Sequence, residues 1–252
     1  MIRAFSSLVF LIGVFSNSVI ADSRQSAYEL LSPTNQAMQT DMSLNPALFA
    51  ILDGEILWNE KSSVNGKSCA SCHGDVKKSM QGVSAQFPRI VQKKLTNLEG
   101  QINECRVVRQ SLTPFNYESK PLLDLSTLIA FQSRGLPIKA SIDQNTDNDL
   151  KEGKQLYFQR IGQLNLSCAQ CHDERAGLKL AGSTIPQAHP TGYPIYRLEW
   201  QSMGSLQRRL RNCMSGVRAE QYPYGSRELT QIELYLMQRA NGMRIESPGI
   251  RP

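Results

Sequence analysis

The sequence predicts a mainly α-helical protein composed of two tandem domains related by internal duplication. Three observations support this prediction: a cysteine- and histidine-containing motif that occurs twice, segments about a hundred residues apart that align without gaps, and apolar residues that recur at helical spacing. The two-residue alternation typical of long β-strands is absent from the sequence. A chain of 252 residues has room for two domains of ordinary size.

The first 21 residues have the pattern of a signal peptide. Arg3 provides a positive charge, residues 8–15 form an apolar run too short to span a bilayer, and residues 19–21 offer small side chains for cleavage. We therefore expect a mature chain that begins at Asp22 and is exported to the periplasm. A retained membrane anchor is the alternative, and no later apolar run is long enough for a membrane span.

The chain is basic, with a formal charge of +6 at pH 7. Such a charge suits an anionic ligand, an acidic partner protein or a membrane surface. The sequence contains no nucleic-acid-binding motif, and export separates the protein from nucleic acid. We therefore expect no nucleic-acid partner.

The internal repeat divides the chain into an extension and two domains. Three pairs of segments align without gaps: residues 53–73 with 152–172, 97–105 with 205–213, and 125–131 with 229–235. Each unit is predicted to contain a helix, the repeated motif, an irregular loop, a helix that carries a cysteine, a turn and a final helix. The polar segment 141–149 marks the linker. The predicted parts are a signal peptide (1–21), an N-terminal extension (22–46), a first domain (47–142) and a second domain (143–252).

Each repeat contains the sequence C-x-x-C-H, which attaches c-type haem through two thioethers and supplies a histidine to the iron. Covalent attachment is predicted at Cys69, Cys72, Cys168 and Cys171. The proximal iron ligands would be His73 and His172. This interpretation gives two cytochrome c-like domains with two covalently bound haems. Zinc binding and a redox-active cysteine pair are the alternatives, and two copies in matching surroundings disfavour both.

The residues alone leave several candidates for the sixth iron ligand. His189 has no counterpart in the first repeat, and a single loop histidine is more typical of a surface residue. No two methionines occupy equivalent positions: the first repeat has Met80 after its motif, and the second has Met203, Met214, Met237 and Met243. Cys105 and Cys213 do occupy equivalent positions. They could be thiolate ligands or could form a disulfide, and their places in separate domains favour ligation.

The motifs and their surroundings resemble the SoxA family, the larger cytochrome subunit of SoxAX complexes in thiosulfate-oxidising Sox systems. The resemblance spans nearly the whole mature chain and is densest in residues 168–182, 191–220 and 233–252. Because the first motif is intact, the chain resembles the dihaem form of the family.

The resemblance implies an L-cysteine S-thiosulfotransferase that joins thiosulfate oxidatively to a cysteine of a SoxYZ carrier protein and passes two electrons to haem. It implies that Cys105 and Cys213 are the distal iron ligands and that Cys213 is the catalytic residue, present as a persulfide. It further implies a SoxX-type monohaem cytochrome subunit and a downstream cytochrome c acceptor.

The segment 205–220 surrounds Cys213 with four arginines. Arg209 lies four residues before Cys213, so the two share a helix face, and it falls on the position of the family's substrate-binding arginine. A guanidinium suits an oxyanion such as thiosulfate. The matching residue in the first repeat is Gln101, so the second haem is the catalytic candidate and the first is a relay or structural group. Arg218 is a weaker candidate.

Two other functions fit two haems. A dihaem electron carrier would use stable His/Met ligation and would need no arginine beside a thiolate. A dihaem peroxidase would need an open distal position with a group that assists O–O cleavage. The resemblance favours the transferase over both.

Overall fold

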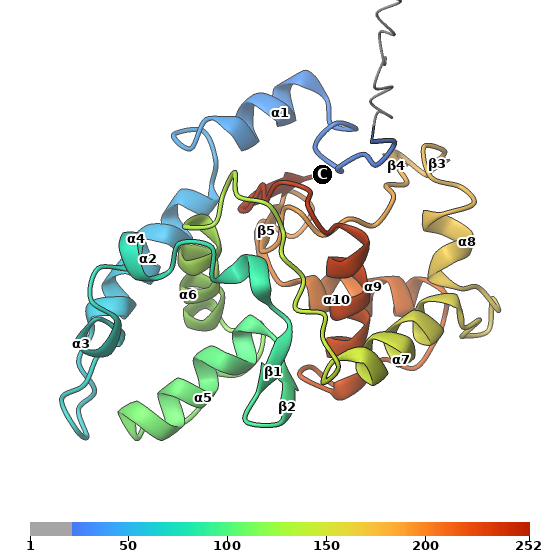
Figure 1. The fold of residues 1–252 in the computed structure, drawn as a ribbon. Coiled ribbons are helices and arrows are strands. Elements are labelled where there is room, and N and C mark those ends of the chain that lie inside the picture. The colour runs from blue at the N-terminus through green and yellow to red at the C-terminus, as the bar shows by residue number, and fades with distance from the viewer. Residues whose placement is uncertain (1–21) are drawn as a thin grey trace, which may run out of the picture.

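The computed structural model describes residues 22–252, so the predicted signal peptide lies outside the described residues. The described chain begins with helix α1 (Pro33–Thr40) and continues into two helical halves (Figure 1). The elements of the first half are α2 (Ala47–Asn59), α3 (Cys69–His73), α4 (Val76–Ser79), the 3-10 helix η1 (Ser84–Gln86), β1 (Arg89–Val91), β2 (Lys94–Thr96), α5 (Leu98–Gln110) and α6 (Lys120–Phe131). The elements of the second half are α7 (Asp147–Phe158), α8 (Cys168–His172), β3 (Lys179–Leu180), β4 (Ser183–Thr184), β5 (Ile195–Arg197), β6 (Ser202–Gly204), α9 (Leu206–Gly216), α10 (Arg227–Arg239) and β7 (Gly249–Arg251). Within residues 22–252, none of the helices has the length and apolar character needed to cross a membrane.

The predicted helices are present. Helices α6 and α10 contain the two apolar repeats, α5 and α9 carry the two additional cysteines, and both C-x-x-C-H motifs form short helices. The strands are an addition to the prediction. Each is two or three residues long, which is too short for an alternating pattern to be visible in the sequence.

The first and last helices of each half cross at a glycine. Helix α2 packs against α6, and α7 packs against α10. A Cβ atom at Gly54 would lie 2.5 Å from the carbonyl oxygen of Asp124, and a Cβ atom at Gly153 would clash with the carbonyl of Gln231. Only a residue without a side chain allows the backbones to approach so closely. Gly54 and Gly153 are paired in the repeat, so the two halves share the same helix crossing.

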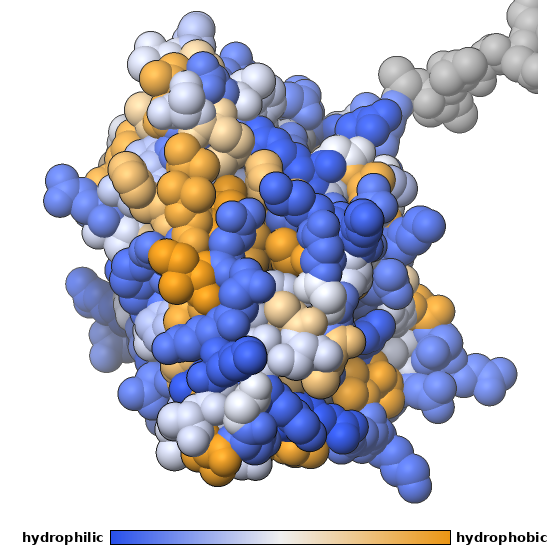
Figure 2. All heavy atoms as spheres, turned by 90° about the vertical axis from the view of Figure 1, so that its left-hand side faces the viewer, coloured by the Kyte–Doolittle hydropathy of each residue, from blue (hydrophilic) through white to orange (hydrophobic). Residues whose placement is uncertain are grey.

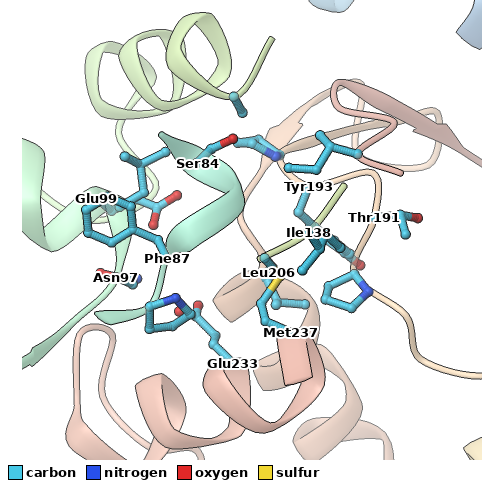
Figure 3. A pocket seen from close by; sticks show the side chains of 16 residues that line it. Ser84, Phe87, Asn97, Glu99, Ile138, Thr191, Tyr193, Leu206, Glu233 and Met237 are labelled. Carbon is cyan, nitrogen blue, oxygen red and sulfur yellow. The ribbon is translucent and has the colours of Figure 1, made fainter. Parts of the chain in front are cut away.

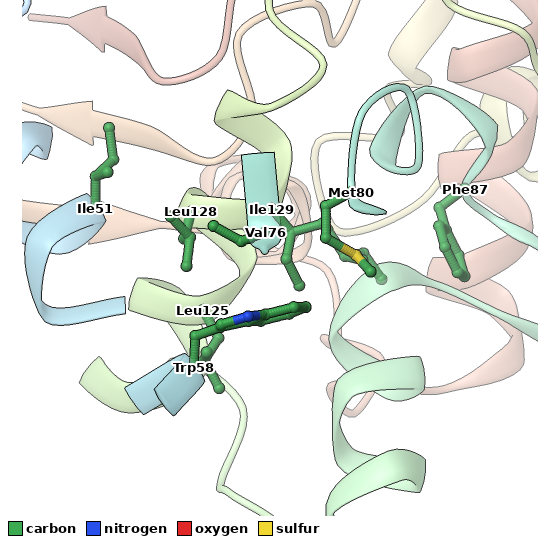
Figure 4. Packing of buried hydrophobic residues seen from close by; sticks show 9 residues of the cluster. Ile51, Trp58, Val76, Met80, Phe87, Leu125, Leu128 and Ile129 are labelled. Carbon is green, nitrogen blue, oxygen red and sulfur yellow. The ribbon is translucent and has the colours of Figure 1, made fainter. Parts of the chain in front are cut away.

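Each half has its own apolar core. Figure 4 shows the core of the first half, in which Trp58 of α2 lies against side chains of α6. The buried members are Ile51, Trp58, Val76, Met80, Phe87, Leu98, Leu125, Leu128 and Ile129. The core of the second half contains Tyr157, Ala169, Ile232, Tyr235 and Leu236. Trp58 and Tyr157 are paired in the repeat, and each is the aromatic residue through which the first helix enters the core.

The two halves also pack against each other. Strand β5 pairs with β6 in antiparallel and with β7 in parallel orientation, forming a three-stranded sheet in the second half. Met203 of this sheet belongs to one buried cluster with Ala50 of α2 and Leu123 of α6. A second cluster joins Ala85 and Ile138 to Met237, Ala240 and Ile245. Apolar contacts therefore hold the two halves together, and the C-x-x-C-H motif of each half is placed relative to the other through them.

The N-terminal extension contacts the second half before the chain enters α2. Gln39 is buried, and its Oε1 accepts hydrogen bonds from the Ile250 N–H and from Arg251 Nη1, both at 2.9 Å. Asn45 Nδ2 donates to the Pro248 carbonyl at 3.2 Å. The extension thus joins the C-terminal strand to the first helix of the first half.

Helix α2 is apolar on its outer face as well as on its inner face. Phe49, Leu52 and Ile56 are 71%, 47% and 68% exposed. Figure 2 shows the side of the molecule that carries α2, where apolar side chains gather between polar ones. Because α2 lacks an amphipathic period, its sequence alone does not indicate which side faces the core.

The glycine crossing gives the first prediction. We expect Gly153→Ala to lower the free energy of unfolding by about 1–3 kcal/mol, because the added methyl group forces α7 away from α10. Chemical denaturation would measure the change. Gly216→Ala is the matched control, since a Cβ atom there meets nothing within 4 Å. Equal stability of the two variants would contradict the crossing as described.

Candidate functional site: two C-x-x-C-H motifs and their cysteines

Each C-x-x-C-H motif begins with a serine that caps its short helix. Ser68 Oγ accepts a hydrogen bond from the Ser71 N–H at 3.0 Å, and Ser167 Oγ accepts one from the Gln170 N–H at 3.3 Å. The side chains of Ser71 and Gln170 accept in return from the backbone N–H of the capping serines, both at 3.0 Å. This reciprocal pair fixes the first turn. The two cysteines and the histidine of each motif therefore project from one short helix.

An aromatic side chain ties each motif to the helix crossing. Trp58 Nε1 donates to the Gly74 carbonyl at 3.0 Å, and the Tyr157 hydroxyl donates to Asp173 Oδ1 at 2.9 Å. Gly74 and Asp173 both follow the motif histidine. The two halves thus use different chemical groups for the same contact.

His172 is oriented for metal binding through its other ring nitrogen. Its Nδ1 lies 2.7 Å from the Pro186 carbonyl oxygen, so Nδ1 carries the proton and donates. Nε2 is then the unprotonated nitrogen, which is the form that can bind a metal. Burial lowers the pKa of His172, which keeps the imidazole in the neutral form that a metal requires.

The first half contains a cavity of about 480 Å³ beside its motif. Its wall includes Cys69, Cys72, His73 and Cys105. The rest of the wall is largely apolar, and three arginines join it: Arg89, Arg106 and Arg109. This size is typical of cofactor sites, and haem combines an apolar ring with two carboxylates that cations can bind. The residues of this cavity therefore fit a covalently attached haem.

Cys105 and Cys213 have corresponding places in their two halves. Burial raises the pKa of Cys69 to about 11, and the nearby Cys105 adds to the effect. Burial likewise raises the pKa of Cys168 to about 12, with Cys213 adding to it. Each additional cysteine therefore lies close to the first motif cysteine of its own half. No disulfide joins Cys105 and Cys213, which was the alternative to ligation, within residues 22–252.

The residue four positions before Cys105 contacts its sulfur, and an arginine has the corresponding position before Cys213. In the first half, Gln101 Nε2 donates to Cys105 Sγ at 3.2 Å. Arg209 has the corresponding position in the second half, and its charge lowers the pKa values of both His172 and Tyr193. Within residues 22–252, Arg209 forms no side-chain hydrogen bond or ion pair. Its guanidinium is thus available beside the second motif.

The other arginines of this segment are directed elsewhere. Arg208 stacks on Trp200, with its guanidinium carbon 4.0 Å from the ring centroid. Arg211 lies 4.3 Å from the ring centroid of Tyr224. Arg218 is exposed in the turn after α9. The helical spacing that separated Arg209 from Arg208 and Arg211 therefore agrees with the structure.

Tyr193 and Arg197 also lie near Cys213, and the sequence did not single them out. Burial raises the pKa of Tyr193, while the charge of Arg209 opposes the rise and Cys213 adds to it. Burial lowers the pKa of Arg197, and the positive charge of Arg209 lowers it further. These residues come from β5 and the loop before it, where no helical spacing relates them to Cys213. Only the fold brings them together.

His189 is not a surface residue, contrary to the expectation from its loop sequence. It is 7% exposed, and its Nδ1 lies 2.9 Å from the Gln25 carbonyl oxygen. It therefore anchors the N-terminal extension. Met80, by contrast, lines the first-half cavity together with Cys105, so both potential ligands lie beside the first motif.

Comparisons with known proteins agree with this geometry. The model of the SoxA/TsdA cytochrome c domain matches residues 53–138 and 152–245. The L-cysteine S-thiosulfotransferase subunit SoxA of Pseudaminobacter salicylatoxidans is 36% identical over 216 residues, which cover 84% of this chain and 76% of the relative. The subunit of the same name from Paracoccus pantotrophus is 34% identical over 232 residues, covering 91% and 80%. The crystal structure of SoxXA from P. pantotrophus is similar with a TM-score of 0.88 at 33% identity, covering 91% of this chain and 87% of that chain.

The motifs give the second prediction. We expect a variant with Cys69→Ala and Cys72→Ala to lose one covalently bound haem and to retain the other, because each motif attaches its own group. Intact-mass measurement of the purified protein would count the haems. Cys105→Ala is the control, since that thiol forms no thioether and both haems should remain attached. Two covalent haems in the double variant would contradict the attachment sites.

Proposed function

The chain belongs to the SoxA/TsdA cytochrome c family, and on that basis we propose that it is the SoxA-type subunit of an L-cysteine S-thiosulfotransferase. In the proposed reaction, thiosulfate is joined oxidatively to a cysteine thiol of a SoxYZ-type carrier protein. The thiol loses its proton, an S–S bond forms to the outer sulfur of thiosulfate, and two electrons leave. A dihaem electron-transfer protein without bond-making activity is the alternative.

The cofactors in this proposal are two covalently bound c-type haems, one in each of the domains 47–142 and 143–252. They would be attached through the four motif cysteines, with the motif histidines as proximal ligands and Cys105 and Cys213 as distal ligands. Haem supplies one-electron acceptor chemistry when bound. The cavity of the first half and the protonated Nδ1 of His172 support this assignment.

One difference between the halves carries the proposal. The halves match in their glycine crossing, their capped motif and their additional cysteine. They differ four residues before that cysteine, where the first half has Gln101, which donates to Cys105, and the second half has Arg209. A neutral amide suffices for a structural or relay haem. A dianionic substrate calls for a cation, and a guanidinium offers several donors suited to oxyanions. An electron carrier gains nothing from this exchange.

Cys213 has two roles in the proposed mechanism: it binds the second haem iron and holds the reacting sulfur as a persulfide. The thiolate is both the metal-binding and the nucleophilic form of cysteine. Arg209 has the opposite charge to a thiolate and to the thiosulfate anion. Arg209 would also hold the thiosulfate anion against the sulfur.

The proposed partners follow from the proposed reaction. The similar crystal structure is titled as that of SoxXA, which supports a SoxX-type monohaem cytochrome as the second subunit. The electrons would pass to a downstream cytochrome c. A periplasmic location is proposed because haem attachment to C-x-x-C-H and the signal-peptide pattern both belong to exported proteins.

The third prediction concerns Arg209. We expect Arg209→Gln, which introduces the residue of the first half, to lower kcat/KM for thiosulfate about ten- to a hundred-fold. The loss of a charged hydrogen bond costs about 1.5–3 kcal/mol, and each 1.4 kcal/mol is about one decade in rate. Steady-state conjugation assays at sub-saturating thiosulfate would measure it. Arg218→Gln is the comparison variant and should change the rate little; equal effects would place the anion elsewhere.

The fourth prediction concerns Cys213. Methionine can ligate iron but cannot form a thiolate or persulfide, so Cys213→Met should retain both covalent haems, raise the potential of one haem and abolish conjugation of thiosulfate to the carrier cysteine. Redox titration and a conjugation assay on the same sample would test both effects. Cys105→Met is the matched control and should alter the other haem while much of the activity remains. An active Cys213→Met variant with an unchanged spectrum would refute both roles.

A further inference from the structure

Two glutamates from different halves meet in a buried cavity between the halves. Glu99 lies at the second position of α5 and is 9% exposed, and Glu233 lies in the middle of α10 and is 5% exposed. Both line a cavity of about 80 Å³ whose other walls come from residues of both halves. Figure 3 shows the two carboxyl groups entering this cavity from α5 and α10. Two negative charges at this place would be costly, because both side chains are withdrawn from bulk solvent.

Two buried amide groups lie beside the glutamate pair, and their nitrogens are left without a hydrogen-bond partner in the described part of the chain. Asn97 and Gln207 are 4% and 0% exposed, and their amide nitrogens have no hydrogen-bond partner within residues 22–252. Their amide oxygens are occupied: Asn97 Oδ1 accepts from the Gly100 N–H at 2.9 Å, and Gln207 Oε1 accepts from the Gly225 N–H at 2.8 Å. The nitrogens are therefore left to donate. Both amides lower the pKa of Glu233, so both nitrogens face that carboxyl group.

The charges around the pair are mostly of the same sign. Burial raises the pKa of Glu233 well above its usual value, and Glu99 and Glu118 raise it further. Burial raises the pKa of Glu99 to about 7, and Glu118 adds to that rise. The nearby cations, Arg208 and Arg211 of α9, act on Glu118. No cation within residues 22–252 forms an ion pair with Glu99 or Glu233, so the charge of the pair is reduced by binding a proton.

The pair lies beside the cavity that contains the first motif. Leu98 and Phe87 line both this cavity and the haem-sized cavity of the first half, so the two spaces share a wall. Helices α5 and α9 both begin at the pair, with Glu99 and Gln207 at equivalent positions, and each helix later carries its additional cysteine. An added negative charge beyond such a wall favours the protonated pair, because the interior screens charge weakly.

We propose that Glu99 and Glu233 form an internal proton-binding site between the two halves, and that this site takes up a proton from solvent when the first haem is reduced. For each electron that a bound haem would accept, the pair would take up one proton from solvent, so that charge is balanced. The electron comes from thiosulfate in the proposed reaction or from dithionite in a titration. The link to haem rests on the cofactor assignment given above, whereas the proton site itself does not.

The first experiment tests the proton site by stability. An acid whose pKa is raised by folding stabilises the fold below its unfolded pKa, and that contribution is lost as pH rises through the folded pKa. Wild-type holoprotein should therefore lose melting temperature between about pH 5 and about pH 8, relative to Glu99→Gln and Glu233→Gln. Both variants keep the approximate size and shape of the side chain and remove its ionisation. Glu104→Gln, an exposed change on the same helix, should follow the wild type. Parallel melting profiles for the wild type and both pair variants would overturn the site.

The second experiment tests the link to the first haem. Mediated redox titration of the holoprotein over the same pH range should show a potential that falls as pH rises. If reduction raises the proton affinity of the pair tenfold, the total shift is about 59 mV for one electron. Glu99→Gln and Glu233→Gln should flatten this dependence, and Glu104→Gln should preserve it. A pH-independent wild-type potential, or variants that keep the full dependence, would overturn the link even where the stability result holds.

Discussion

Two glycines set the geometry on which both halves depend. At Gly54 and Gly153 the first helix of a half lies against the backbone of the last helix, closer than any side chain would permit. One turn further along, Trp58 or Tyr157 enters the core and bonds to the residue that follows the motif histidine. The position of each motif is therefore fixed by the crossing. The packing of two helices thus determines where each C-x-x-C-H motif lies.

The duplicated frame allows the two sites to differ at individual positions. Because the crossing, the cap and the additional cysteine are shared, a change at one position of α5 or α9 alters the chemistry at one sulfur without moving the rest. Gln101 donates a neutral hydrogen bond to Cys105, whereas Arg209 provides a charge at the same helical position. The same helices differ again at their first turns, where Glu99 of α5 corresponds to Gln207 of α9. The two halves therefore share one backbone arrangement, and a few polar side chains make their sites chemically different.

The sequence predicted the features that depend on local spacing. The capped motif helices, the helices around the repeated apolar residues and the shared face of Arg209 and Cys213 all follow from periodicity along one element. The features it did not predict depend on contacts between distant segments. The short strands have too few residues for a pattern, Tyr193 and Arg197 reach Cys213 only through the fold, and the buried place of His189 depends on the N-terminal extension. The Glu99–Glu233 pair is also of this kind, since each residue alone resembles an ordinary helix-surface glutamate.

The binding of the N-terminal extension to the last strand has a consequence for the order in which the chain can mature. The partners of Gln39 and Asn45 lie more than two hundred positions later in the sequence, at Ile250, Arg251 and Pro248. A chain made from its N-terminus offers these partners last, and contacts of such long range form slowly. Multidomain chains commonly complete one domain before the next appears. Here the segment that leads into α2 gains these hydrogen bonds only after β7 has been synthesised. The first half is therefore completed later than its place in the sequence suggests.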